Sequence, residues 1–406
     1  MPIRKNPGIA ISIMLAAAVV LFARVPEAAA ATVPTVTVGS RQIVLTHSQR
    51  SGDLFYYPDT TYGAVQVGDT YYLFASSYIS SIGHTGIIGI TTTDLDKLRS
   101  TYSRIKITQN LPLGGSGSFD QNYTGGGPVY FDSADGLLIM LYHGEYWYTG
   151  TGSPFYAGLG LAVSRDLGQT WTRLGEVLSP AVPRNDCGQG AHGPSFDIGV
   201  GDLLARPDGY LYAYFNDMND PTCADSSMVT AVARAPIASV IASAQAGGQP
   251  PGTLFMKYCN GSFGCPGMNN PNDPAAGGGA SSNVMSGFRA FTPSVSYDSA
   301  ISEYVGVFPH DGREMKLTFS PDGINWSNPV TVLSGKRRSK GFDYFLGTLL
   351  NTSGGDPNNL GSSFYLYYDS PYGVWSKTNL YRVQITLSGT GVSGSGTAVP
   401  SIPSPH

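Results

Sequence analysis

Residues 125–171 have the sequence GGGPVYFDSADGLLIMLYHGEYWYTGTGSPFYAGLGLAVSRDLGQTW. Apolar runs of about four to eight residues, broken by Gly, Asp and Pro, predict a strand, a tight turn, a second strand, a long loop and a third strand, followed by a turn that closes at Trp171. The second strand ends in YHGE, so Glu145 places a carboxylate where that strand stops. Helical periodicity is nearly absent elsewhere. The clearest helix candidate is residues 236–246, which begin with proline and are followed by Gly247.

Four further segments repeat this layout and begin near Tyr62, Gly201, Pro293 and Phe345. Successive units are about 70 residues apart, and each predicts four strands in an up-and-down order. Tandem units of this kind favour an all-β fold, a five-bladed β-propeller of four-stranded antiparallel blades, because radial repetition leaves only short sheet edges. Residues before Tyr62 are expected to supply the strand that closes the ring. The alternative is a pair of β-sandwiches, which would not repeat the turn chemistry so regularly.

The ends of the chain differ in composition from the repeats. Arg4 and Lys5 precede an uncharged apolar run, and small residues follow at 28–31, which is the layout of a secretory signal peptide. We therefore expect a signal peptide over residues 1–31, a propeller domain over 32–387 and a disordered Gly/Ser/Pro-rich tail over 388–406. An uncleaved N-terminal anchor is the alternative for the first segment. The mature protein is expected to be secreted, extracellular or periplasmic, with no membrane contact after cleavage.

The amino-acid composition limits the kinds of molecule that the protein is expected to bind. Only 13% of the residues are charged and the formal net charge is −4, so no basic surface for nucleic acid is expected. The 52 glycines and 25 tyrosines suit an extracellular β-protein with many tight turns. A monomer is expected.

Four cysteines in an exported chain indicate two disulfides. Cys259 and Cys265 are close enough in sequence for a local bridge, and Cys187 and Cys223 would then join two loops. Four cysteines allow three pairings, and all three remain open at this stage.

Two turns of the repeat resemble the Asp-box pattern S-x-D-x-G-x-T-W. One is residues 164–171, SRDLGQTW, and the other is the shorter SPDGINW at 320–326. An Asp side chain can hydrogen-bond to its own turn, and a glycine supplies the positive φ. Asp166 and Asp322 are therefore expected to stabilise turns rather than to catalyse a reaction.

Several acids are expected at one mouth of the propeller. In an up-and-down blade, the entry to the first strand and the exit of the second share one face, whereas the Asp-box turns lie on the opposite face. The shared face would hold the candidate catalytic residues Asp59, Glu145, Asp197 and Asp202. A single Asp at a strand end is more commonly a turn former, and Asp217, Asp311 and Asp369 recur in register with Glu145.

Glycoside hydrolysis needs two carboxyl groups on either side of a sugar ring, of which one is ionised and the other protonated. Glu145 has aromatic neighbours, and an apolar setting raises a carboxyl pKa, which favours Glu145 as general acid. Asp59 lies beside Thr60 and Thr61, whose hydroxyls would keep it ionised as base or nucleophile. Asp202 or Asp197 would orient a group or tune its pKa.

A second set of residues is expected to contact the substrate. It combines aromatic rings for stacking with polar side chains near the mouth: Tyr57, Tyr62, His143, Trp147, His192, Arg289, His310, Asp311 and Asp343. A structural role is the alternative for the histidines. No metal-ligand motif and no cofactor are predicted, and a structural calcium or sodium ion in the central channel is left open.

The segments DTTYGAVQVGDTYYLFAS, LYHGEYW, SPDGINW and FMKYCNGSFGCPG together resemble secreted five-bladed propeller glycosidases of the arabinanase and β-xylosidase group. That resemblance implies an Asp on the first inner strand as base, matched by Asp59, and an Asp in the second blade that tunes a pKa, loosely matched by Asp120. It also implies a Glu in the third blade as acid. There the sequence departs from the group, because its third unit offers Asp197 and Asp202, and Glu145 belongs to the second.

These observations predict a secreted glycoside hydrolase acting on an extracellular polysaccharide or oligosaccharide. An arabinan-like pentofuranose polymer is slightly favoured, by the resemblance alone. A carbohydrate-binding propeller without catalysis is one alternative, since aromatic residues and Asp-box turns would serve it equally well. A sialidase-like enzyme is another.

Overall fold

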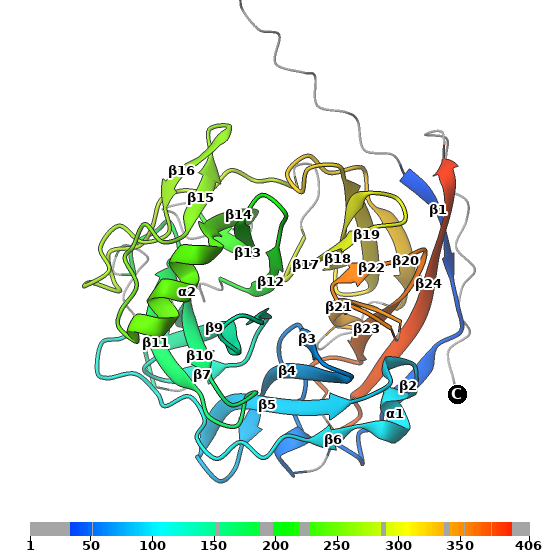
Figure 1. Ribbon diagram of the computed structural model, residues 1–406, viewed down its shortest axis with the longest axis horizontal. Helices are drawn as coiled ribbons and strands as arrows, with labels where there is room; N and C mark the ends of the chain where they lie inside the picture. Colours follow the sequence, from blue (N-terminus) through cyan, green and yellow to red (C-terminus); the bar gives the residue numbers. More distant parts are fainter. Residues whose placement is uncertain are drawn as a thin grey trace, which may run out of the picture.

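Five small sheets stand around a central axis in the computed structural model (Figure 1). The structure describes residues 33–391 except 51, 151–153, 185, 187–197, 220–227, 286–289, 337–341, 353 and 375. The predicted fold class is confirmed: the chain forms a five-bladed β-propeller, and within each blade consecutive strands are antiparallel.

The blades follow the sequence order of the predicted units. Blade one contains β3 (Gly63–Val67), β4 (Thr70–Ile79), β5 (His84–Thr92) and β6 (Ser103–Arg104). Blade two contains β7 (Tyr123–Gly125), β8 (Val129–Asp132), β9 (Leu137–Trp147), β10 (Phe155–Ser164) and β11 (Thr172–Leu178). Blade three contains β12 (Val200–Ala205), β13 (Tyr210–Met218), β14 (Met228–Pro236), β15 (Met256–Cys259) and β16 (Ser262–Pro266).

Blade four contains β17 (Ser294–Asp298), β18 (Glu303–His310), β19 (Glu314–Ser320) and β20 (Val330–Ser334), with β22 (Asn359–Leu360) parallel to β17. Blade five contains β21 (Phe345–Asn351), β23 (Ser363–Ser370) and β24 (Asn379–Gly391), together with β1 (Val33–Val38) and β2 (Gln42–Leu45). Four sheets therefore have five strands in the described residues, one more than the repeat predicted.

The helical elements are few and short. They are α1 (Leu98–Thr101), α2 (Ile237–Ala246) and the 3-10 turns η1 (Gly52–Leu54) and η2 (Leu95–Lys97). The predicted helix is α2, which Pro236 caps at its N-terminus and Gly247 ends with φ 72°. No helix in the described residues has the length and hydropathy needed to cross a bilayer.

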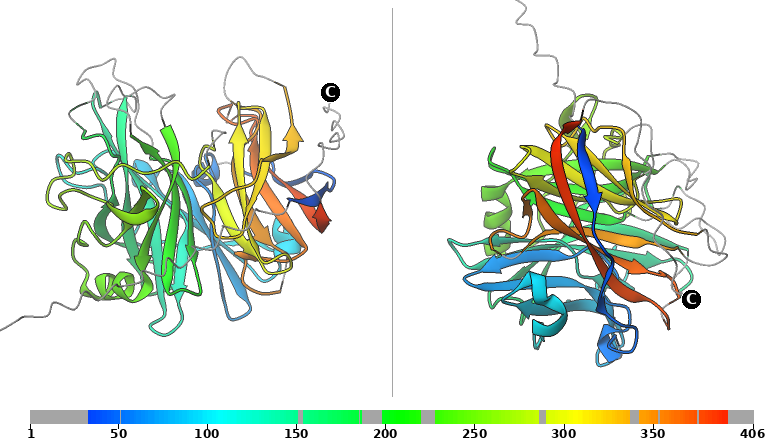
Figure 2. Two further views of the ribbon diagram at one scale, coloured as in Figure 1. Left: turned by 90° about the horizontal axis from the view of Figure 1, so that it is seen from above. Right: turned by 90° about the vertical axis from the view of Figure 1, so that its right-hand side faces the viewer.

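The two ends of the described chain close the ring, as the sequence predicted. β1 and β2 both pair with β24, so the N-terminal strand becomes the outermost strand of the last blade. The right-hand view in Figure 2 shows blue β1 running beside red β24. β24 continues to Gly391, so residues 388–391 of the expected tail pair with β1 instead of being disordered.

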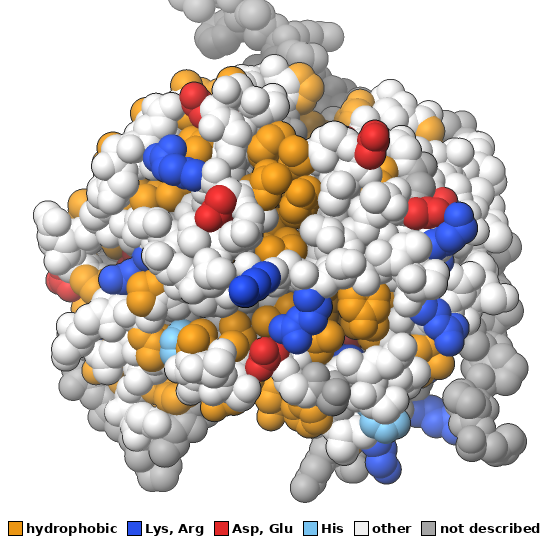
Figure 3. All heavy atoms as spheres, turned by 60° about the horizontal axis from the view of Figure 1, so that its bottom comes forward, with side chains coloured by type: hydrophobic (Ala, Val, Ile, Leu, Met, Phe, Trp, Pro, Cys, Tyr) orange, Lys and Arg blue, Asp and Glu red, His pale blue; other side chains and the backbone are white. Residues whose placement is uncertain are grey.

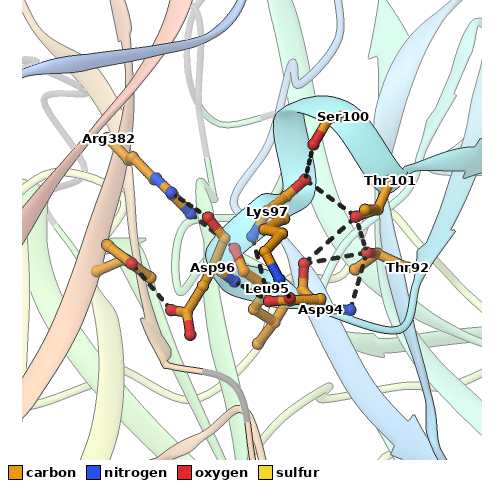
Figure 4. Close-up of polar contacts among 9 residues, drawn as sticks. Thr92, Asp94, Leu95, Asp96, Lys97, Ser100, Thr101 and Arg382 are labelled. Carbon is orange, nitrogen blue, oxygen red and sulfur yellow. Dashed lines mark hydrogen bonds and ion pairs between the residues drawn. The ribbon is translucent and has the colours of Figure 1, made fainter.

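The seam between the last and first blades is also bonded through Arg382 of β24. Its guanidinium donates to the backbone oxygens of Leu95 (2.6 Å) and Asp96 in η2, so blade five holds a turn of blade one (Figure 4). Asp94 caps that turn by accepting from the backbone N–H groups of Asp96 and Lys97. The propeller is thus closed by strand pairing and by side-chain bonds.

The hydrophobic core is divided among the blade interfaces. Each of the five large clusters of buried apolar side chains combines residues of two adjacent blades, including the pair formed by blades five and one. The turn at Asp166 supports the interface between blades one and two. The Asp166 carboxylate accepts from the backbone N–H and the hydroxyl of Thr170. The buried ring of Trp171 packs edge-on against that of Phe74, with ring centroids 5.4 Å apart. On the face shown in Figure 3, charged side chains lie scattered among uncharged ones.

The predicted local disulfide joins Cys259 to Cys265 between β15 and β16. Cys187 and Cys223, the other predicted pair, lie outside the described residues.

Candidate active site

Asp59 and Glu145 lie at the same end of adjacent blades. Asp59 precedes β3, and its backbone N–H donates to the carbonyl of Ser76 in β4 at 2.9 Å. Glu145 lies near the exit of β9, where its carbonyl accepts from the Asn122 N–H at 3.0 Å. The entry to the first strand and the exit of the second share one face of each blade, which we call the mouth. The third-to-fourth-strand turns, including the Asp166 turn, lie at the other face.

A chain of side chains leads from Ser76, whose backbone bonds to that of Asp59, across the blade boundary to Glu145. The Ser76 and Tyr123 hydroxyls lie 3.3 Å apart, and the Tyr123 ring centroid is 5.5 Å from that of His143, edge to face. His143 Nε2 in turn lies 3.2 Å from Glu145 Oε1. The charge on Glu145 is also among the causes that raise the Asp59 pKa. The two carboxylates therefore belong to one electrostatic cluster.

The pKa of Asp59 is raised, so its carboxyl group keeps a proton up to near neutral pH. Burial of its carboxyl group is the largest cause that raises its pKa from 3.8 to about 7, and the negative charges of Glu145 and Asp369 add to it. Tyr372 opposes the shift by donating its O–H to Asp59 Oδ1 at 3.1 Å. The Tyr372 pKa is itself raised well above its ordinary value, chiefly by burial, so this hydroxyl keeps its proton.

The threonine hydroxyls do not supply the support that the sequence suggested for ionised Asp59. The Thr60 hydroxyl oxygen accepts from the Ser76 N–H at 3.1 Å, and the Thr61 hydroxyl donates to the carbonyl of Gly201. The hydrogen bond that Asp59 accepts comes from blade five, through Tyr372.

Glu145 is held by two ring N–H groups. The indole Nε1–H of Trp147 donates to Glu145 Oε2 at 2.6 Å. His143 Nδ1 lies 3.1 Å from the carbonyl of Ile198, which can only accept, so Nδ1 carries a proton. One proton shared between His143 Nε2 and Glu145 Oε1 then completes the second contact of the imidazole.

Asp202, another predicted catalytic residue, is held by hydrogen bonds to its own backbone neighbour and to blade four. The buried Asp202 carboxylate accepts from its neighbour's N–H and from Ser294 Oγ (2.8 Å) and Val295 N–H (3.0 Å) of β17. Burial raises the Asp202 pKa to about 6. Its carboxylate therefore joins the inner strands of blades three and four. Asp197 lies outside the described residues.

The expected sugar-stacking role of two tyrosines does not hold. Tyr57 and Tyr62 are 0% and 2% exposed, and their rings pack against each other at 5.5 Å between blades one and five. Their place in the sequence resembled that of mouth residues, but both side chains turn into the core. His192 and Arg289, also expected to contact substrate, lie outside the described residues.

Three further candidates lie at the mouth side of blades four and five. His310 Nε2 is 3.5 Å from the carboxylate of Asp311, whose side chain is 62% exposed. Asp343 is buried, and its carboxylate accepts from the Lys336 N–H at 2.7 Å, which holds the adjacent loop. Asp343 thus has a structural use, whereas Asp311 is open to solvent.

Asp120, the loose match for a pKa-tuning residue, is buried and paired inside blade two. Arg173 Nη1 lies 2.8 Å from Asp120 Oδ1, and the Tyr142 hydroxyl donates to Oδ2 at 2.7 Å. These contacts fix the wall of the blade.

The contribution of blade five was missed from the sequence. Tyr372 reaches Asp59, and its ring packs 4.3 Å from that of Phe345, which is stacked on Phe342. A signal was present, because Tyr372 follows the exit of β23 much as Tyr146 and Trp147 follow Glu145 at the exit of β9. In the described part of the chain, no three His, Cys, Asp or Glu side chains are grouped to hold a metal ion.

The chain was compared with known families, curated proteins and solved structures. No protein-family model and no curated protein matches the chain. The catalytic domain of the Coprinopsis cinerea GH62 α-L-arabinofuranosidase is 14% identical, with a TM-score of 0.49, covering 87% of this chain and 98% of that one. Zg3597, a family 117 glycoside hydrolase of the marine bacterium Zobellia galactanivorans, is 9% identical, with a TM-score of 0.47 and coverages of 89% and 91%.

The RS223 β-xylosidase structure is 11% identical, with a TM-score of 0.48 and coverages of 84% and 95%. The function proposed below rests on the side chains of the mouth.

Proposed function

We propose that this protein is a glycoside hydrolase whose reacting pair is Asp59 and Glu145. The observation that carries the proposal is the cluster at the mouth. It holds two carboxylates from adjacent blades, one partly buried with a pKa of about 7 and the other in contact with the ring nitrogens of Trp147 and His143. A protonated and an ionised carboxyl group are the two parts that glycosidic bond cleavage requires.

The environments favour roles opposite to those expected from the sequence. Asp59 would be the general acid, because a pKa near the working pH leaves a large protonated fraction and a good proton donor. Its O–H would protonate the glycosidic oxygen as the bond to the anomeric carbon breaks. The Asp59 carboxylate left behind would then be stabilised by the Tyr372 O–H, because hydrogen bonds to charged acceptors are stronger.

Glu145 would act at the anomeric carbon. Its carboxylate contacts the ring nitrogens of Trp147 and His143, and it would serve as a nucleophile or as a base that takes a proton from the attacking water. His143 is fixed by the carbonyl of Ile198, so it would hold Glu145 in place through the reaction.

The proposed substrate is an extracellular polysaccharide or oligosaccharide. Arabinan-like pentofuranose polymers come first, on the sequence resemblance. Export fits this use, and we propose that residues 1–31 are removed as a signal peptide; N-terminal sequencing of the secreted protein would test this. A monomer with no nucleic-acid or membrane partner remains our expectation.

The test is the release of reducing ends from a panel of arabinans, xylans and galactans by the wild-type protein and by Asp59→Asn and Glu145→Gln. Each substitution keeps the side-chain shape and should lower kcat by about 100-fold or more. Asp69→Asn is the matched control, because Asp69 is exposed in the β3–β4 turn at the far face. Binding of these polymers without release of sugar by the wild type would instead support a carbohydrate-binding propeller. Full activity in both mouth variants would exclude the proposed pair.

A further inference from the structure

Three aromatic rings of blade five form a continuous row that ends at Asp59. Phe342 and Phe345 are stacked, with ring centroids 5.0 Å apart and planes 11° from parallel. Phe345 and Tyr372 follow at 4.3 Å, and the Tyr372 hydroxyl bonds to the Asp59 carboxyl group. We call Phe342, Phe345 and Tyr372 the aromatic row.

The backbone fixes the row in place. Phe342 and Tyr372 form an antiparallel bridge, with N–H···O distances of 3.2 and 3.0 Å in the two directions. Phe345 begins β21 and pairs with Asp369 of β23. On the other side the row meets Gly312, where an added Cβ would lie 2.3 Å from the Phe342 ring. A glycine there, with φ 65°, lets the blade-four turn approach the ring closely.

One end of the row is open to solvent. Phe342 is 40% exposed, one of only four large hydrophobic side chains so exposed in the described residues, whereas Phe345 is 7% exposed. The exposed Phe342 ring lies 6.2 Å from the ring of Tyr372, which bonds to the candidate acid Asp59. An exposed aromatic ring in this position has the character of a ligand contact, because binding sites place apolar and aromatic surfaces next to a few polar groups. The electron-rich face of such a ring suits the C–H face of a sugar.

We propose that the aromatic row is a subsite that stacks a neutral sugar ring on the leaving-group side of the cleaved bond. This inference rests on the proposed function. Around the propeller the order is the aromatic row on blade five, Asp59 before blade one, and Glu145 on blade two. The general acid donates to the oxygen of the leaving group, so the leaving sugar lies on the Asp59 side, away from Glu145. That direction leads to the aromatic row.

The experiment compares two substrates of the same cleaved sugar. One is an oligosaccharide whose leaving group is a sugar ring, and the other is the methyl glycoside, whose leaving group has no ring to stack. Phe342→Ala should raise KM for the oligosaccharide about tenfold and change the methyl glycoside by less than about twofold. Phe342→Trp keeps an aromatic face and should restore KM for the oligosaccharide.

Two controls separate this inference from folding and from the proposed function. Ile43→Ala removes an exposed hydrophobic side chain from β2, far from the mouth, and should leave both substrates unaffected; melting curves should show all variants folded. If the wild type cleaves the oligosaccharide and Phe342→Ala cleaves it equally well, the subsite is refuted while the hydrolase stands. If the wild type neither cleaves nor binds any sugar of the panel, both are refuted.

Discussion

The hydrogen bond between Tyr372 and Asp59 gives the sharpest test of how the mouth works. Tyr372→Phe removes a single hydroxyl and leaves the ring that packs on Phe345. The hydroxyl donates to the carboxyl group and so favours its ionised form. Without it, the Asp59 pKa should rise further.

The size of the shift follows from the strength of that bond. Hydrogen bonds to charged groups contribute about 1.5–3 kcal/mol. One pKa unit corresponds to about 1.4 kcal/mol, so losing the bond should raise the Asp59 pKa by about 1–2 units. From the wild-type value of about 7, the variant should titrate at about 8–9.

The assay is the pH dependence of kcat/KM on the best polysaccharide fragment. If Asp59 is the acid, kcat/KM falls on the alkaline side as Asp59 loses its proton, and Tyr372→Phe should move that alkaline limb up by about 1–2 pH units. If Asp59 is the base, the limb near pH 7 is the acidic one, and the same substitution moves it upward with loss of activity at neutral pH. An alkaline limb that stays in place would refute the coupling of Tyr372 to a catalytic acid, and an acidic limb near pH 7 would reverse the roles of Asp59 and Glu145.

Three further predictions concern groups that take no part in the proposed reaction. Burial raises the Glu176 pKa from 4.5 to about 8, so its contribution to stability is complete below about pH 4.5 and is lost as the pH rises through 8. Glu176→Gln should remove up to roughly 5 kcal/mol of that pH dependence, measured as the free energy of unfolding in denaturant titrations at pH 5 and 9. An equal pH dependence of stability in the wild type and the variant would contradict this. Lys257→Met leaves Asp217 buried without its cation and should cost about 3–5 kcal/mol, whereas adding Asp217→Leu should recover much of the loss. Asp166→Ala should lower the free energy of unfolding by about 1–3 kcal/mol with kcat unchanged, and a fall in kcat in the folded variant would give this turn a role that its far-face position does not explain.

The fold could be predicted because its signals are local and repeated. Turn residues and period-two apolar runs recur about every 70 residues, and each repeat predicts the same four strands in the same order. The extra strands could not be predicted, because they are two-residue or split pieces such as β22 and the β7–β8 pair, which are too short to show a period. The boundary of the tail was missed for a different reason. Residues 388–391 are Ser, Gly and Thr, and they are ordered by pairing with β1 from the opposite end of the chain.

The site was only partly predictable. Strand direction alone predicted that Asp59 and Glu145 lie at the same face of the propeller. His143 and Trp147 are close to Glu145 in sequence, so their proximity could also be expected. Tyr372 contacts Asp59 across 313 residues, and a contact of that kind has no local signal. Side-chain direction was the other gap: nothing in the sequence distinguished the buried rings of Tyr57 and Tyr62 from rings that line the mouth.

Two aspartates occupy the position of Glu145 in other blades, and their partners differ from those of Glu145. Asp217 is paired with buried Lys257 at 2.8 Å, and Asp369 accepts from both terminal nitrogens of buried Arg50 at 3.2–3.3 Å. A buried carboxylate needs such a partner, and a permanent cation makes it a structural element of the blade.

Glu145 has a different kind of partner. The groups that bond to its carboxylate are two ring nitrogens, His143 Nε2 at 3.2 Å and Trp147 Nε1 at 2.6 Å. Its side chain is also 13% exposed, so a ligand can approach it. The difference in residue type at this strand end thus coincides with a difference in partners, because Lys257 and Arg50 pair with the two aspartates whereas ring nitrogens contact Glu145. In the same cluster, burial raises the Asp59 pKa to about 7. A reaction that requires one carboxyl group to give a proton while another stays ionised can use this pair.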